Sequence, residues 1–183
     1  MFHILILQTI ILIPRTSLKV VKFKEMTIDS SSPDLQEPQS RRIILGKISD
    51  SIVLKQLIET DAPVFYDLVN RNRDHFNQFG LGYAEMYPTL DSVEYALAHP
   101  DNPKKYVFGI WEGQTLVGEN SVLDCEDGSG LIESMVGKEF ARERFAARGR
   151  ALLIDFAFNQ LGLDKLIGHA VADNKASRKS VED

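Results

Sequence analysis

The stretch IDFAFNQLGLDKLIGHAVADNKASRKSVE, residues 154–182, predicts the end of one helix, a strand and the start of another helix. Apolar residues recur at helical spacing over residues 145–161, and Gly162 follows where such a helix would stop. The aliphatic run at 166–171 predicts a strand, and Asn174 can cap a helix after it. Because strands joined by a long helix lie parallel, we expect the strand before this helix to run parallel to the strand after it.

Towards the N-terminus, the sequence indicates one strand, two helices and three further strands before the long helix. Pro63 and Thr89 mark the two helix starts, one as a first-turn proline and the other as a cap. The expected strands are residues 52–58, 106–111, 115–123 and 131–136. This order predicts an α/β (α+β) domain with a mixed, mostly antiparallel sheet and helices on both of its faces.

The N-terminal part reads as an extension and linker, residues 1–45, in front of a single domain at 46–183. The apolar run at residues 2–13 is too short to cross a bilayer as a helix, and basic residues follow it rather than precede it. Met26 opens a stretch rich in serine, proline and acidic residues, which is typical of a linker. Three interpretations stay open for the apolar run: a natural start at Met26 that excludes it, a secretory signal, and a loosely attached strand or interfacial segment.

The composition limits the kinds of partner. The 26 acidic and 21 basic residues give a net charge of -5, which disfavours nucleic acid as a partner. Cys125 is the single cysteine and cannot form an internal disulfide, and the four histidines lie too far apart for a zinc site, so we expect no metal. These features favour a cytoplasmic protein without firm membrane association.

Three stretches of the chain resemble one known family: VLKQLIETDAPVFYDLVNRNRDHF (53–76), VFGIWEGQTLVGENSVLD (107–124) and the segment 154–182 quoted above. The family is the GNAT superfamily of N-acetyltransferases, and within it the RimJ/RimL-like ribosomal-protein acetyltransferases. The resemblance implies that the strands at 131–136 and 166–171 splay apart around the cofactor. It also implies acetyl transfer without a metal, with acetyl-CoA as co-substrate and a protein or small-molecule amine as acceptor.

The acceptor follows from the acid–base chemistry of amines. An amine attacks only in its neutral form, and a chain-terminal amine, with a pKa of about 7.7, loses its proton more readily than a lysine at about 10.4. The N-terminal amine of a protein is therefore the expected acceptor.

The resemblance implies catalytic residues as well. Ser177 lies in the DNKAS segment, where the family pattern has a serine that gives a proton to the departing thiolate, and Asn174 would contact the cofactor. Both residue types also suit an ordinary helix cap, so that interpretation stays open. Glu133 is the carboxylate placed to act as general base, although the facing of its strand is ambiguous by one register.

The loop that opens the long helix departs from the family pattern. The pattern has two glycines, which let backbone N–H groups approach the coenzyme A pyrophosphate, where this chain has Arg142 and Arg144. A left-handed backbone at an arginine would cost about 1–2 kcal/mol, whereas the guanidinium groups could instead pair with phosphate. The expected cofactor-binding residues are Met135, Val136, Arg142, Arg144, Phe145, Ala146 and Asn174.

A second departure concerns the C-terminal part. The family continues past the final helix into a strand hairpin, which the residues up to Asp183 do not include, so we expect an incomplete copy with an open sheet edge. Such an edge predicts low solubility or a need for a partner. Two functions stay open: an acetyltransferase, and a non-catalytic remnant or binding module that has lost acetyl-CoA binding. The sequence leaves the acceptor's identity and the oligomeric state undecided.

Overall fold

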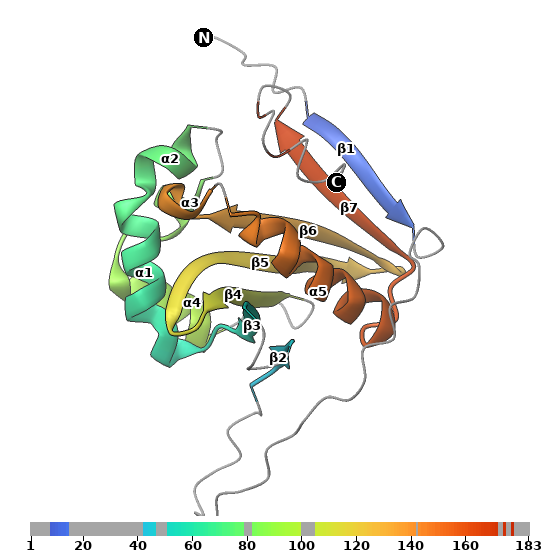
Figure 1. Cartoon of the computed structure of the whole chain (residues 1–183), viewed down its shortest axis with the longest axis horizontal. Helices are drawn as coiled ribbons and strands as arrows, with labels where there is room; N and C mark the ends of the chain where they lie inside the picture. The colour runs from blue at the N-terminus through green and yellow to red at the C-terminus, as the bar shows by residue number, and fades with distance from the viewer. Residues whose placement is uncertain are drawn as a thin grey trace, which may run out of the picture.

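The computed structural model describes residues 8–14, 42–46, 51–78, 82–99, 105–141, 143–171, 174 and 177. They form one seven-stranded sheet in the order β1-β7-β6-β5-β4-β3-β2 (Figure 1). The strands are β1 (Gln8–Pro14), β2 (Ile44–Leu45), β3 (Val53–Gln56), β4 (Tyr106–Glu112), β5 (Thr115–Glu126), β6 (Ser129–Val136) and β7 (Lys165–Val171). Every neighbouring pair is antiparallel except β6 with β7, which confirms the predicted mixed sheet.

Helices cover both faces of the sheet. They are α1 (Ala62–Arg71), α2 (Arg73–Asn77), α3 (Tyr83–Met86), α4 (Leu90–Ala98) and α5 (Phe145–Asn159). On one face, Phe156 of α5 packs edge-on against Phe108 of β4, with ring centroids 5.4 Å apart, inside a buried apolar cluster. A second cluster on the other face joins Phe65 of α1 and Val93 of α4 to Met135 of β6. Figure 1 shows α5 in front of the sheet and α1 to α4 gathered at its left.

Local sequence signals located several elements correctly. Thr89 caps α4: its hydroxyl accepts a hydrogen bond from the Ser92 amide at 3.2 Å, and the Ser92 hydroxyl accepts one from the Thr89 amide at 3.2 Å. Gly162 follows the end of α5 with a positive φ of 71°. The sequence did not predict α2, α3 or β2, which are five, four and two residues long and too short to carry a periodic pattern.

The parallel strands β6 and β7 pair over only part of their length. Four residue pairs join them, the last being Ile132 with Gly168. Beyond that pair, β6 continues beside β5 and β7 continues beside β1. Figure 1 shows the two strands close together at the right and diverging towards the left. We call the diverging part, residues 133–136 of β6 and 169–171 of β7, the fork. It confirms the expected splayed pair.

The outer edge of β7 is covered by β1. Seven residue pairs join these strands in antiparallel register, from Gln8 with Val171 to Pro14 with Lys165. The expectation of an open sheet edge is therefore wrong for β7. It failed because no local signal in a sequence pairs a strand near one end of the chain with a strand near the other. Of the three interpretations of the N-terminal apolar run, the attached strand matches the structure of residues 8–14. The proposed domain boundary between residues 45 and 46 stays a prediction.

A chain without residues 2–14 tests whether β1 stabilises the sheet. Its loss would leave the N–H and C=O groups along the β7 edge without a strand partner, and such an edge pairs readily with other chains. We expect the melting temperature to fall by about 5 °C or more and light scattering to detect larger species. A chain lacking only residues 2–7, which keeps β1, is the matched control; equal melting temperatures and masses for the two truncated chains would contradict this role.

Candidate functional site

The two faces of the fork carry different side chains. Side chains alternate along a strand, and Ile132 packs in the cluster under α5 whereas Met135 packs in the cluster under α1 and α4. Glu133 therefore lies on the same face as Met135, and Val136 packs on the α5 side. The structure thus resolves the register ambiguity of this strand. The Met135 side chain is itself buried, at 3% exposure, so only its backbone borders the fork.

Glu133 is the first residue of β6 beyond its last pair with β7. Its side chain reaches solvent, yet the surrounding protein displaces enough water to raise the pKa of the carboxyl above its ordinary value. Of the neighbouring charges, Lys105 and His169 oppose this rise in pKa and Asp124 adds to it. A carboxylate with a raised pKa is suited to accept a proton near neutral pH.

Tyr87 and Glu119 extend the polar environment on this face of the sheet. Both side chains are buried, and Glu119 lies on β5 opposite Met135. Burial raises the pKa of the Tyr87 phenol, and the negative charges of Glu119 and Glu133 raise it further. The phenol therefore keeps its proton at physiological pH and can donate a hydrogen bond.

A second polar group lies on the α5 face of β6, centred on Ser134. Its hydroxyl accepts a hydrogen bond from Nδ2 of Asn120 at 2.6 Å, and Nε and one terminal nitrogen of Arg150 each lie 3.4 Å from it. Arg150 is buried, at 7% exposure, and burial lowers the pKa of its guanidinium. Neighbouring Gly149 leaves room for Asn120, because a Cβ on it would lie 2.4 Å from Oδ1. A buried cation thus lies beneath the strand that borders the fork.

The first turn of α5 has the backbone geometry of an anion site, with one strained residue. Helical hydrogen bonding begins with the Arg148 amide donating to the Arg144 carbonyl at 3.0 Å, so the amides of residues 145–147 point out of the helix end. Arg144 adopts the left-handed conformation, with φ 57° and ψ 21°. Phe145 is buried in the core and Ala146 is half-buried, so they offer backbone groups rather than side chains. Arg142 lies outside the described residues.

A family model described as an acetyltransferase (GNAT) domain matches residues 51–183. The chain belongs to the GNAT acetyltransferase family. The search among curated proteins gave no match.

The GNAT domain is similar in fold to several solved acetyltransferases. The ribosomal-protein-S5-alanine acetyltransferase from Vibrio fischeri is 15% identical with a TM-score of 0.65, and the match covers 73% of this chain and 78% of that one. RimL, a ribosomal L7/L12 alpha-N-protein acetyltransferase, is 15% identical with a TM-score of 0.64, over 77% and 78%. The microcin C7 self-immunity acetyltransferase MccE, solved with acetyl-CoA and AMP, is 20% identical with a TM-score of 0.61, over 74% and 78%. At these identities the likeness shows the fold alone.

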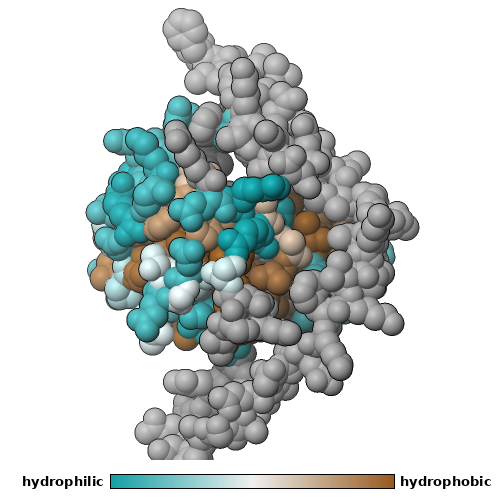
Figure 2. Space-filling model, viewed as in Figure 1, coloured by the Kyte–Doolittle hydropathy of each residue, from teal (hydrophilic) through white to brown (hydrophobic). Residues whose placement is uncertain are grey.

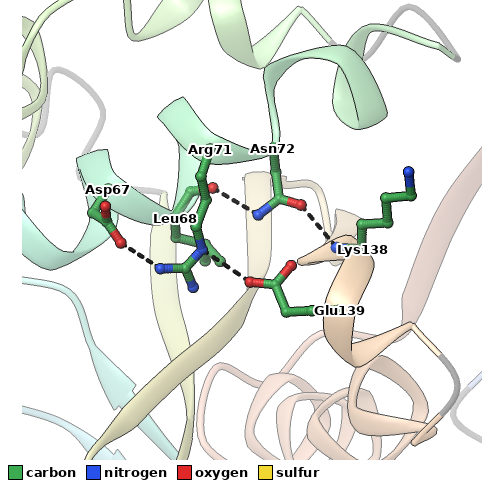
Figure 3. A network of polar contacts seen from close by, with 6 residues as sticks. All are labelled: Asp67, Leu68, Arg71, Asn72, Lys138 and Glu139. Carbon is green, nitrogen blue, oxygen red and sulfur yellow. Dashed lines mark hydrogen bonds and ion pairs between the residues drawn. The ribbon is translucent and has the colours of Figure 1, made fainter.

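In this GNAT domain, Asn72 ties the end of α1 to the segment that follows β6. It is buried, its Nδ2 donates to the Leu68 carbonyl at 3.0 Å, and its Oδ1 accepts from the Lys138 amide at 2.8 Å (Figure 3). Lys138 begins the 3-10 turn η3 (Lys138–Phe140), which leads towards the start of α5. A buried side chain bonded at both ends fixes backbone position, so Asn72 helps to place the loop before the helix.

A second contact, on the surface, reinforces the same junction. Nε of Arg71 donates to the Glu139 carboxylate at 2.9 Å, and the same guanidinium also bonds Asp67 one turn earlier (Figure 3). Burial alone would raise the pKa of the Glu139 carboxyl, but a hydrogen bond from its own backbone amide and the charge of Arg71 outweigh it and lower the pKa. In the view of Figure 2, hydrophilic residues cover much of the described surface around α1 and α2, with hydrophobic residues showing between them.

The two predicted residues after β7 form a local contact. Oδ1 of Asn174 accepts a hydrogen bond from the Ser177 amide at 3.0 Å, and the Asn174 amide donates to the Val171 carbonyl at 2.9 Å. This is the geometry of a helix cap. The role of the Ser177 hydroxyl as a proton donor stays a prediction.

Two further observations concern other kinds of site. In the part of the chain that the structure describes, no three histidine, cysteine, aspartate or glutamate side chains come together as a metal-binding group would require. Over the same residues, no helix has both the length and the apolar character needed to cross a membrane.

Sequence reasoning missed Arg150, although a signal was present. Arg150 precedes Leu153 by three residues and Ala157 by seven, and both are buried on the inner side of α5. A charge within an apolar helical stripe indicates a buried polar contact rather than a solvent-exposed residue. Tyr87 and Glu119 carried no comparable signal, because their burial depends on how α3 and β5 pack.

Replacing Arg144 by glycine tests the strain at the start of α5. Glycine adopts a positive φ without a Cβ clash, so we expect Arg144→Gly to raise the free energy of unfolding by about 1 kcal/mol and the melting temperature by about 2–4 °C. Arg148→Gly makes the same chemical change at a helical position and should lower stability by about 1 kcal/mol or more. Denaturant unfolding of both variants measures this; a loss of stability in Arg144→Gly would contradict the assigned strain.

Proposed function

We propose that this domain transfers an acetyl group from acetyl-CoA to a primary amine, with the N-terminal amine of a protein as acceptor. The fork is the observation that supports this proposal. Residues 133–136 of β6 have β5 on one side and, within the described residues, no strand partner on the side from which β7 diverges. Backbone groups without a strand partner need water or a ligand, and an extended thioester-bearing arm can lie along them.

The residues around the fork fit such a co-substrate. The outward-pointing amides of residues 145–147 and the positive end of the α5 dipole suit a diphosphate, and Arg144 adds a cation at the same end. Met135 and Val136 would contribute backbone groups beside the acyl portion, and Asn174 would contact the arm near the end of β7. When bound, acetyl-CoA would supply an activated acyl carbon.

Glu133 is the proposed general base. The acceptor nitrogen forms a bond to the acyl carbon, the carbon–sulfur bond breaks, the nitrogen gives one proton to the Glu133 carboxylate, and the thiolate takes up a proton. Ser177 is the proposed donor of that last proton, and the protonated Tyr87 phenol is a further donor on the face of Glu133. A carboxylate can perform this step only when ionised, so its raised pKa places the acidic limit of activity nearer neutral pH.

The choice of a protein N-terminus rests on chemistry and on two similar folds. An α-amine is partly neutral at physiological pH, whereas a lysine amine requires much stronger help from the base. The first two of the similar structures named above act, by their names, on ribosomal proteins. A small-molecule amine is the alternative acceptor class.

A second candidate function is a non-catalytic domain that has lost acetyl-CoA binding. The left-handed Arg144 favours it, because a long side chain stands where the helix end would receive the diphosphate. Calorimetric titration with coenzyme A separates the two candidates. Micromolar affinity supports the transferase. The absence of both binding heat and a thermal shift at millimolar coenzyme A would reject it.

The catalytic part is tested with Glu133→Gln in an acetylation assay on an N-terminal peptide. Because a general base contributes about 10²–10⁴-fold, we expect kcat to fall by that factor while the affinity for coenzyme A is unchanged. In the unaltered chain, activity should decline as pH falls through the Glu133 pKa, since protonation removes the base. Glu112→Gln, at the exposed end of β4, is the control. Retention of full kcat in Glu133→Gln would remove Glu133 from the mechanism.

A further inference from the structure

At the start of the fork, a second titratable residue, His169, lies at the same level as Glu133 on the neighbouring strand. The last pair of the parallel ladder is Ile132 with Gly168, so Glu133 and His169 are the next residues in the same register and the first that do not pair. His169 lies within β7 (Lys165–Val171), at the level where the two strands begin to part. Paired neighbouring strands lie about 4.8 Å apart, and Glu133 and His169 stand one residue beyond the last such pair.

Both side chains lie on the same face of the sheet. Leu166 packs in the cluster under α5, so the alternate residues Ile167 and His169 face the other way, towards the side of α1 and α4. Glu133 faces that side too, because it alternates with Ile132. The His169 side chain is exposed. An amine that entered the fork from this face would therefore meet a carboxylate on one strand and an imidazole on the other.

The backbone of His169 is held from the opposite edge. In the antiparallel ladder of β1 with β7, Ile10 is the partner of His169. Past Gly168, β7 therefore keeps one neighbouring strand although β6 has left it. This support fixes the level at which His169 stands, so its placement beside Glu133 is a property of the sheet rather than of a loop.

We propose that His169 is a positioning residue for Glu133: its imidazolium, across the first unpaired level of the fork, holds the Glu133 carboxylate in the ionised form that accepts a proton from the acceptor amine. The inference rests on the proposed transferase function for its catalytic meaning. A cation beside a carboxylate favours the ionised form of that carboxylate, and a protonated imidazole can supply this charge from across the fork. The pair would extend the active range of the base to lower pH.

Other charged groups act on Glu133 from the neighbouring elements. Lys105, which precedes β4, favours the ionised carboxylate as His169 does, whereas Asp124 of β5 disfavours it. The Tyr87 phenol, before α4, stays neutral and adds no charge of its own. Variants of His169 and of Lys105 therefore separate the contribution that comes from β7 from the one that comes from the residue before β4.

The test that needs no activity is a carbon-13 NMR pH titration of the Glu133 carboxyl in the full chain. In His169→Gln the midpoint should rise by about 0.5 pH units, because a nearby cation has been removed, and His169→Lys should return it to or below the original value. Lys105→Gln should also raise it and Asp124→Asn should lower it. An unchanged or lowered midpoint in His169→Gln, while Lys105→Gln raises it, would overturn the proposal.

The kinetic test links the pair to catalysis. In His169→Gln, the acidic limb of the pH profile of kcat/KM for an N-terminal peptide should move up by the same amount, and activity above that limb should change less than twofold. A uniform loss of kcat at all pH values would mean a structural role and reject positioning. If the unaltered chain transfers no acetyl group but the titration behaves as expected, the His169–Glu133 coupling stands and the proposed function fails.

Discussion

The account depends on one feature of the sheet: β6 and β7 part after four residue pairs, while β6 stays paired with β5 and β7 stays paired with β1. The parallel ladder ends after Ile132 and Gly168, and both strands continue with a partner on one side. Backbone groups on the inner edges of the fork then lie outside the sheet's own hydrogen bonding. A polar, extended ligand satisfies such groups better than an apolar side chain can.

The surroundings of the fork follow from the same divergence. The helix α5 connects β6 to β7, so its N-terminal turn comes shortly after the end of β6, and Asn72 and Arg71 hold the intervening segment against α1. Polar groups occupy both faces of β6 at this level, with Glu133 on one and Ser134 beside the buried Arg150 on the other. A sheet packed only by apolar cores on both faces would not require charged side chains such as Glu133 and Arg150 at this level.

The sequence predicted the parts of this arrangement that depend on local chemistry. Thr89 as a cap and Gly162 as a helix end act through neighbouring residues, and both were recognised. The pairing of β1 with β7 could not be predicted, because it joins segments whose only shared property is an apolar run. The facing of Glu133 required knowledge of which core Ile132 and Met135 enter, since strand alternation fixes only the relative order. The position of His169 opposite Glu133 could be recognised only from the register of the parallel ladder.

The claim that a thioester-bearing arm lies in the fork is tested most directly by hydrogen–deuterium exchange of the backbone amides with and without coenzyme A. The account predicts slower exchange at residues 133–136 and at residues 145–147 when the ligand is present, with unchanged exchange in β3 and β4. Unchanged exchange at residues 133–136 in millimolar coenzyme A, or slowing confined to elements that do not border the fork, would contradict it.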